Sequence, residues 1–151
     1  MIKFTVFGDA APKGSSKPFI PKGWNRAIVT SATKGLKAWE WKIAAAAGAQ
    51  ANGVLLTDAT IVIVTFFLSR PKALKQGKLA HHTKRPDLDK LIRGATDALT
   101  GIVWKDDAQV VGIMATKAYT QRQDEAPRAE FRIMSLEESR WDVPPPCGVE
   151  V

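Results

Sequence analysis

Five aspartates lie within a short stretch near the middle of this 151-residue chain. They are a third of its fifteen acidic residues: Asp87, Asp89, Asp97, Asp106 and Asp107. Asp89, Arg93 and Asp97 follow one another at intervals of four, so on a helix they share one face. Asp87 stands at the start of that helix, where its carboxylate can swing toward that of Asp89, and Asp106 and Asp107 follow the helix in a turn. We expect the chain reversal there to return one of these two carboxylates to the cluster.

Such a cluster has the composition of a site that cleaves phosphodiesters. Carboxylate oxygens are the ligands that Mg²⁺ prefers, and Mn²⁺ is an accepted substitute. A bound metal activates water and stabilises charge on the attacked phosphate, while Arg93 or Lys90 can neutralise the additional negative charge of the transition state. The chain has one cysteine, Cys147, and two histidines, which argues against zinc and Ser-His-Asp chemistry.

Structural roles for the same residues remain open at this stage. Asp87 and Asp89 stand where a helix begins, a position that capping and the helix dipole favour. Asp97 can simply pair with Arg93, and Asp106-Asp107 is also an ordinary turn sequence. His81 and His82, just before the cluster, are either solvated or placed to contact phosphate.

The charge distribution predicts a polyanionic partner. The net charge is +7, and the C-terminal part from residue 122 is acidic. Two segments hold most of the basic residues: Lys3, Lys13, Lys17, Lys22, Arg26, Lys34 and Lys37, then Arg70, Lys72, Lys75, Lys78, Lys84, Arg85, Lys90 and Arg93. If the fold brings both segments together, they form one phosphate-facing surface for DNA or RNA. Phe19 and Trp24, in the first segment, either stack on bases or pin their loop to the core.

Periodicity and turn residues predict the elements that must position these side chains. We expect strands at 2–7, 60–68, 109–119 and 128–134, with a further short strand at 27–29 and a short extended piece at 102–104. Helices are expected from Ser31 or Thr33, either hydroxyl serving as cap, to Ala51, and from Pro86-Asp87 to Gly101. Loops cover 8–27 and 70–85. The fold class is α+β: one domain over 1–134, with a small mixed sheet and two helices packed on one face. Residues 135–151 form a loosely ordered tail.

The apolar runs are all too short to cross a bilayer. The longest, 59–68, is interrupted by threonines, and residues 1–7 alternate as a strand does and have no signal-peptide layout. We therefore expect a cytoplasmic protein that does not interact with membranes.

One long motif resembles a known family. Arg85-Pro86-Asp87-Leu88-Asp89-Lys90, then Asp97-Ala98-Leu99-Thr100-Gly101, then Trp104-Lys105-Asp106-Asp107-Ala108-Gln109-Val110-Val111 is similar to the RusA family of Holliday-junction resolvases. The similarity extends in outline over residues 1–134 and is strongest over 84–117. It implies a homodimer that binds four-way DNA junctions and makes paired, Mg²⁺-dependent nicks. A resolvase of this type is expected to be bacterial or phage-encoded.

The resemblance also implies roles for single residues. Asp87, Asp89 and Asp107 correspond to the metal-binding carboxylates, with Asp106 beside them as a further contributor. Arg93 occupies the position of the family's catalytic lysine; it keeps the charge but cannot readily release a proton, so Lys90 is the nearest substitute. Lys117 matches a basic position of the family. The residues expected to contact DNA are Lys13, Lys17, Lys22, Arg26, Lys84, Arg85, Lys90 and Lys117.

Two alternative functions stay open. The chain is either a resolvase or a protein that binds branched DNA without cutting it, as the arginine at position 93 would allow. A nuclease acting mainly on flaps or forks is the other alternative. A transcriptional regulator is disfavoured, because the sequence contains no helix-turn-helix pair and a regulator needs no acidic cluster.

Overall fold

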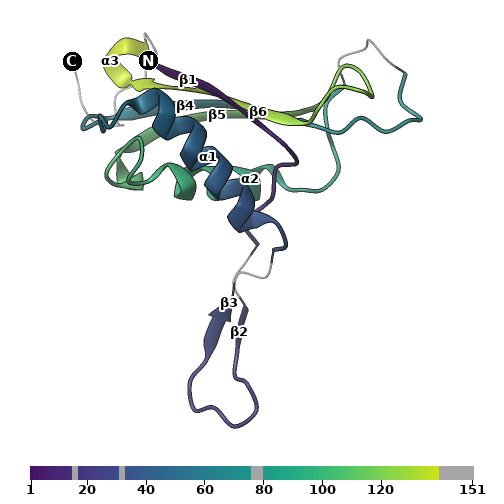
Figure 1. Cartoon of the computed structure of the whole chain (residues 1–151), viewed down its shortest axis with the longest axis vertical. Helices are drawn as coiled ribbons and strands as arrows, with labels where there is room; N and C mark the ends of the chain where they lie inside the picture. The colour runs from purple at the N-terminus through teal and green to yellow at the C-terminus, as the bar shows by residue number, and fades with distance from the viewer. Residues whose placement is uncertain (15–16, 31–32, 76–79, 140–151) are drawn as a thin grey trace, which may run out of the picture.

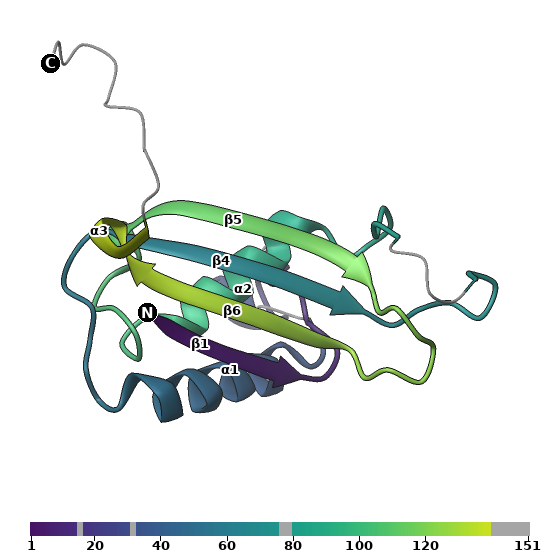
Figure 2. The same ribbon diagram turned by 90° about the horizontal axis from the view of Figure 1, so that it is seen from above.

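A four-stranded mixed sheet is the central element of the fold. The computed structural model describes residues 1–14, 17–30, 33–75 and 80–139. The strands β1 (Ile2–Phe7), β4 (Thr60–Leu68), β5 (Val110–Tyr119) and β6 (Arg128–Ser135) lie in the order β1-β6-β4-β5. The β4 and β5 strands are parallel, and the other two pairs are antiparallel. The edge strands are therefore β1 and β5 (Figure 2).

Two helices cover one face of this sheet, α1 (Leu36–Ala51) and α2 (Leu88–Leu99) (Figure 1). The buried side of α1 is formed by Leu36, Trp39, Ile43, Ala47 and Ala51, and that of α2 by Leu91, Gly94, Ala95 and Leu99. These positions recur every three or four residues, as expected for a helix with one buried stripe. The predicted α+β class, with two helices on one face, is confirmed.

The core lies between the sheet and the helices. Phe131 is at its centre: its ring stacks on Phe4 at a centroid distance of 4.7 Å and meets the edge of Phe66 at 6.3 Å. Trp104, which follows α2, is completely buried. Packing these large rings against the helices stabilises the sheet, since apolar burial is the main favourable contribution to folding.

The expected loop at 8–27 contains a strand that the sequence did not reveal. The strand β2 (Lys17–Phe19) pairs antiparallel with β3 (Ile28–Thr30), with Lys17 opposite Thr30 and Phe19 opposite Ile28. The resulting hairpin stands away from the body of the protein (Figure 1). A three-residue strand that contains proline is too short for its pattern to be recognised.

The first helix begins later than expected. Its N-cap is Gly35, which has a φ of 85° and provides no side-chain cap. The Thr33 hydroxyl instead accepts a hydrogen bond from the backbone N–H of Gly14 at 3.2 Å, and Ser31 lies outside the described residues. The hydroxyl cap predicted at Thr33 is therefore wrong. At the other end, Asn52 in the left-handed conformation terminates α1 as predicted.

Two further boundaries differ from the sequence-based expectations. Residues 102–104 are not a strand, because Trp104 forms only isolated bridges, to Leu56 and to Thr100. The expected tail begins with ordered structure: β6 runs to Ser135, and a short helix α3 (Leu136–Ser139) follows. The carboxylate of Glu138 in α3 forms an ion pair with the Met1 amino group at 3.2 Å. Residues 140–151 lie outside the described part. No helix within that part is long and apolar enough to cross a membrane.

Candidate active site

Strand β5 fixes the segment that leads into α2. The backbone N–H of Tyr119 donates a hydrogen bond to the carbonyl oxygen of Ala80 at 3.0 Å. The backbone N–H of His82 donates one to the carbonyl oxygen of Lys117 at 3.3 Å. The Lys117 ammonium then donates to the carbonyl oxygens of Lys84 and Pro86, each at 2.6 Å. Lys117 thus fixes the position of the backbone at Pro86, the residue immediately before Asp87.

Asp87 occupies the N-cap position of α2 without capping it. Its backbone is extended, and its side chain accepts no hydrogen bond from the first turn of the helix. The carboxylate instead pairs with the Lys90 ammonium at 2.9 Å. Hydrogen bonding and charge from Lys90 lower the pKa of Asp87, so this carboxylate is ionised at neutral pH. The capping alternative is therefore wrong for Asp87.

Asp89 and Arg93 lie one turn apart on α2, and both are exposed. Among the described residues, neither side chain forms a hydrogen bond or ion pair. Asp97, one turn further on, is paired with the Lys13 ammonium rather than with Arg93. The alternative in which Asp97 neutralises Arg93 is wrong, and Arg93 keeps its charge available to an anionic ligand.

Asp107 is held at the far end of α2. It opens a 3₁₀ helix, η1 (Asp107–Gln109), in the turn between α2 and β5. Its Oδ1 accepts a hydrogen bond from the Trp104 indole N–H at 2.9 Å and another from the Thr100 hydroxyl. Because Trp104 is buried, the carboxylate of Asp107 is fixed relative to the core.

Asp106 serves the same turn as its cap. Its carboxylate accepts from the backbone N–H of Ala108 at 2.8 Å, and Gln109 Oε1 accepts from the Asp106 N–H at 3.0 Å. The second of these bonds, together with a bond from the Gln109 N–H to the Asp106 carboxylate, forms a capping box. Gln109 also donates to the Leu56 carbonyl at 2.9 Å, which ties the turn to the chain before β4. The structure thus gives Asp106 a clear structural role.

The turn does not return Asp107 to the other two carboxylates. The twelve residues of α2 span about 18 Å at 1.5 Å per residue. Asp87 and Asp89 stand at its start, whereas Asp107 contacts Thr100 at its end. In the part of the chain that the structure describes, no three His, Cys, Asp or Glu side chains gather closely enough to hold a metal ion. The expected chain reversal is therefore wrong: the buried Trp104 keeps Asp107 at the far end.

The basic residues expected to contact DNA fall into two groups. Lys22 and Arg26 on the hairpin, and Lys84 and Arg85 before α2, have exposed side chains. Three others have protein partners: Lys13 with Asp97, Lys90 with Asp87, and Lys117 with the carbonyls described above. Lys17 lies in β2, and its side chain is outside the described part.

A shallow pocket joins the two basic segments. It is lined by Pro12, Gly14, Arg85, Pro86, Asp87 and Lys90. The backbone N–H of Lys13 donates to the Lys90 carbonyl at 2.9 Å, which attaches the segment before the hairpin to the first turn of α2. The two basic segments thus meet in space at Gly14 and Arg85, beside an aspartate of the expected site, which is the condition for one phosphate-facing surface.

Sequence reasoning missed the residues that position the site. Trp104 and Thr100 both bond Asp107, although the spacing Trp104-x-x-Asp107 places an indole within reach of that carboxylate. Lys117 was expected to contact DNA, and its bonds to Lys84 and Pro86 come from tertiary structure that no local pattern reveals.

Comparison with known proteins identifies the family of this chain. The profile of the family described as Endodeoxyribonuclease RusA matches residues 9–134. The chain belongs to the RusA endodeoxyribonuclease family. The RusA match begins just after β1, includes α2 and η1, and ends within β6. The chain is also similar to "Uncharacterized protein YqaN" of Bacillus subtilis (strain 168), with 28% identity over 144 residues, covering 89% of this chain and 96% of that protein.

Proposed function

We propose that this RusA-family protein is a homodimeric, Mg²⁺-dependent endonuclease that resolves four-way DNA junctions by paired nicks. The observation that carries the proposal is the presentation of Asp87, Asp89 and Asp107 around α2. The first two are exposed at the helix start, and the third is fixed by Trp104 at the helix end. Basic side chains next to Asp87 would draw DNA phosphates toward these carboxylates.

A dimer accounts for the separation of the carboxylates. A two-fold axis perpendicular to α2 makes the helices of two protomers antiparallel, so the start of one lies beside the end of the other. Asp87 and Asp89 of one protomer would then face Asp107 of the partner subunit, and symmetry would repeat this site once. Two equivalent sites suit a junction in which two strands are cut.

The edge of the sheet next to α2 offers a surface for such a dimer. Strand β5 is an edge strand, and Val111, Ile113 and Met114 on it are 50%, 40% and 51% exposed. Large apolar side chains exposed along an unpaired edge strand are typical of interfaces and are hazardous in a monomer. Burying them between two copies would place both α2 helices near the two-fold axis.

The donor set fits a hard divalent cation. The three aspartates offer only oxygen ligands, and Asp89 has no partner among the described residues that would compete for them. Asp107 uses only Oδ1 in its bonds to Trp104 and Thr100, which leaves Oδ2 available. When bound, Mg²⁺ would supply charge neutralisation at the phosphate and a water of lowered pKa.

The surrounding cations would act on the DNA. Arg93 lies one turn from Asp89 on the exposed side of α2, where its guanidinium can contact a phosphate oxygen and stabilise negative charge. Lys90 would stay paired with Asp87 until a cation takes the carboxylate, and its ammonium is then released for the phosphate. Lys84 and Arg85 extend the same basic surface before the helix.

Incubation of the purified protein with an end-labelled four-way junction tests the proposed function. Mg²⁺, Mn²⁺ and EDTA are compared, with linear duplex and flap substrates run in parallel. Symmetric nicks in the junction that require a divalent ion support the proposal. Preferential cutting of flaps would support the alternative substrate, and binding without any cleavage would support the non-catalytic alternative.

A further inference from the structure

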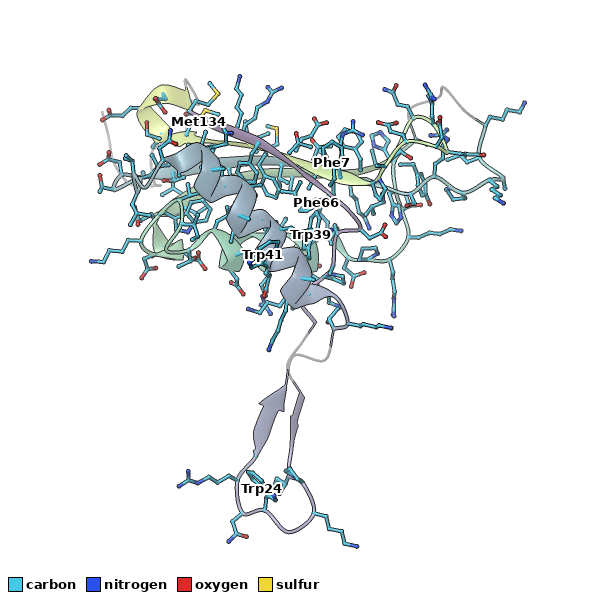
Figure 3. All side chains as sticks on the ribbon, viewed as in Figure 1. Phe7, Trp24, Trp39, Trp41, Phe66 and Met134 are labelled. Atoms are coloured by element: carbon cyan, nitrogen blue, oxygen red, sulfur yellow. The ribbon has the colours of Figure 1, made fainter. Side chains whose placement is uncertain are left out.

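The hairpin formed by β2 and β3 ends in an exposed tryptophan. Eight residues, 20–27, connect the two strands, and Trp24 near their middle is 60% exposed. Figure 3 shows its indole at the far end of the hairpin, distant from Trp39 and Phe66 in the body of the protein. We call residues 17–30 the arm.

Trp24 does not hold the arm in place. The turn at the tip closes through the backbone, where the Trp24 N–H donates to the Pro21 carbonyl at 3.0 Å and Gly23 has a φ of 90°. Within the described residues, the indole forms no hydrogen bond, ring stack or cation–π contact. The alternative in which this aromatic pins its loop to the core is therefore wrong for Trp24. The large apolar indole of Trp24 is therefore exposed to solvent although no contact within the described residues requires it there.

The charge around the arm has a single sign. No acidic residue occurs between Asp9 and Glu40, whereas six basic residues do: Lys13, Lys17, Lys22, Arg26, Lys34 and Lys37. Lys22 and Arg26 flank Trp24 and are exposed. An aromatic side chain between exposed cations has the composition that binds nucleic acid bases and their phosphates together. The positive charge of the arm would repel another basic protein surface, which is therefore excluded as the partner.

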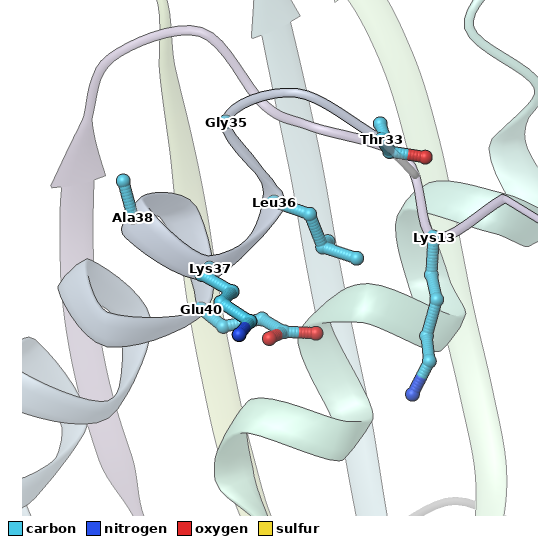
Figure 4. Close-up of a pocket in the computed structure, with 7 residues that line it drawn as sticks. All are labelled: Lys13, Thr33, Gly35, Leu36, Lys37, Ala38 and Glu40. Atoms are coloured by element: carbon cyan, nitrogen blue, oxygen red, sulfur yellow. The ribbon is translucent and has the colours of Figure 1, made fainter. Parts of the chain in front are cut away.

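The root of the arm is attached beside the proposed site. Lys13 is bonded to α2 twice, through its backbone to Lys90 and through its side chain to Asp97. A pocket lined by Lys13, Thr33 and the first turn of α1 marks where the two chain segments of the arm meet the body (Figure 4). Nine residues separate Gly14 from Trp24, so the Cα atoms of these two residues lie no more than about 36 Å apart.

We infer that Trp24 stacks on an exposed base at the branch point of the DNA, while Lys22 and Arg26 contact the neighbouring phosphates. This inference rests on the proposed function, and it assigns to the arm the recognition of branched over linear DNA. In a linear duplex every base face is covered by its neighbour, whereas strand exchange at a junction leaves base faces that an aromatic ring can cover.

Binding of Trp24→Ala, Trp24→Phe and Trp41→Ala to a four-way junction and to a duplex of the same sequence tests the inference. Trp41, on α1, is 72% exposed and serves as the matched control. EDTA is present so that no strand is cut, and 2-aminopurine replaces one base at the branch point. We expect Trp24→Ala to lose about 5- to 140-fold in junction affinity, the range for one stacked base, with duplex affinity unchanged. Trp24→Phe should retain most of the affinity, and Trp41→Ala all of it.

The 2-aminopurine signal separates stacking from general binding. Its fluorescence should change when the wild type binds, and this change should be absent with Trp24→Ala. Equal affinities of Trp24→Ala and the wild type for the junction would overturn the inference, and so would an equal loss on junction and duplex. If the wild type also cuts the junction with Mg²⁺, only the arm inference fails. If the wild type neither prefers nor cuts junctions, the proposed function fails with it.

Discussion

Lys117 on β5 donates a hydrogen bond to the carbonyl oxygen of Pro86 at 2.6 Å. A second bond from the same ammonium to Lys84 means that one side chain holds both ends of the tripeptide before Asp87. The position of the first carboxylate of the proposed site therefore depends on a residue thirty positions later in the chain. A basic residue that the sequence led us to expect at the DNA has a positioning role in the protein itself.

We predict that Lys117→Met impairs cleavage more than binding. Methionine keeps the length of the side chain and removes both hydrogen bonds, which should reduce the free energy of unfolding by about 1–3 kcal/mol. Junction cleavage should fall at least tenfold, and backbone amides of residues 84–89 should exchange hydrogen faster. The exchange measurement decides the role, because a side chain that only contacts phosphate would weaken binding and its salt dependence but leave the exchange unchanged.

The hydroxyl of Thr100 is predicted to orient Asp107. In Thr100→Val the shape is preserved and the donor to Asp107 Oδ1 is lost. We expect metal affinity, measured calorimetrically, or cleavage rate to fall by about 10- to 100-fold, the usual effect of removing an outer-shell partner of a metal ligand. Thr116→Val is the control, since Thr116 is also exposed and, among the described residues, its hydroxyl donates only to the Thr65 hydroxyl across the sheet. Equal behaviour of both variants would remove Thr100 from the site.

Arg93 is predicted to act through its charge. Arg93→Lys should keep cleavage within a few-fold of the wild type, whereas Arg93→Ala should lower it by about 10²-fold with little change in stability. The two rates are measured on the same labelled junction at saturating Mg²⁺. Wild-type cleavage by Arg93→Ala would contradict this role, and a large gain in Arg93→Lys would show that the reaction needs a proton from this position.

His82 is predicted to make stability depend on pH. It is 9% exposed, its ring lies 4.5 Å from that of Tyr119, and burial together with the Lys117 charge lowers its pKa below 6.5. As pH falls below about 6.5, the unfolded chain takes up a proton that folded His82 resists, so the free energy of unfolding decreases. Urea unfolding at pH 7.5, 6.5 and 5.5 should show this slope in the wild type and a smaller slope in His82→Phe. His81→Phe, at an exposed position, should keep the wild-type slope.

The sequence alone was sufficient to locate the helices and strands whose apolar patterns extend over many residues. Strand β4 and helix α2 were located to within about two residues, because β-branched runs and a four-residue apolar repeat are local signals. The short strand expected at 27–29 is present as β3 (Ile28–Thr30), but its partner β2 was missed because it has only three residues and lies nine residues before β3. The cap of α1 was expected at Ser31 or Thr33, and the tertiary structure uses the Thr33 hydroxyl as acceptor for the Gly14 N–H instead.

The candidate site was predictable in its residues but not in its geometry. Spacing placed Asp89 and Arg93 on one exposed face of a helix, which the structure confirms. The position of Asp107 could not be read from spacing, because it follows from burial of Trp104 in a core that residues far apart in the chain create. The roles of these aspartates in binding metal stay a prediction.

Mixing two inactive variants tests the central claim most directly. Asp89→Asn and Asp107→Asn are each assayed alone on an end-labelled four-way junction with Mg²⁺, and then together after exchange of protomers. If the carboxylates of both helix ends form sites shared between protomers, neither variant cuts alone. The mixed dimer then has one intact site, made of Asp87 and Asp89 from one protomer and Asp107 from the other, so it should nick a single strand. Cleavage at the wild-type rate by either variant alone would show that the assigned residues are wrong, and a mixture as inactive as its components would contradict the shared site.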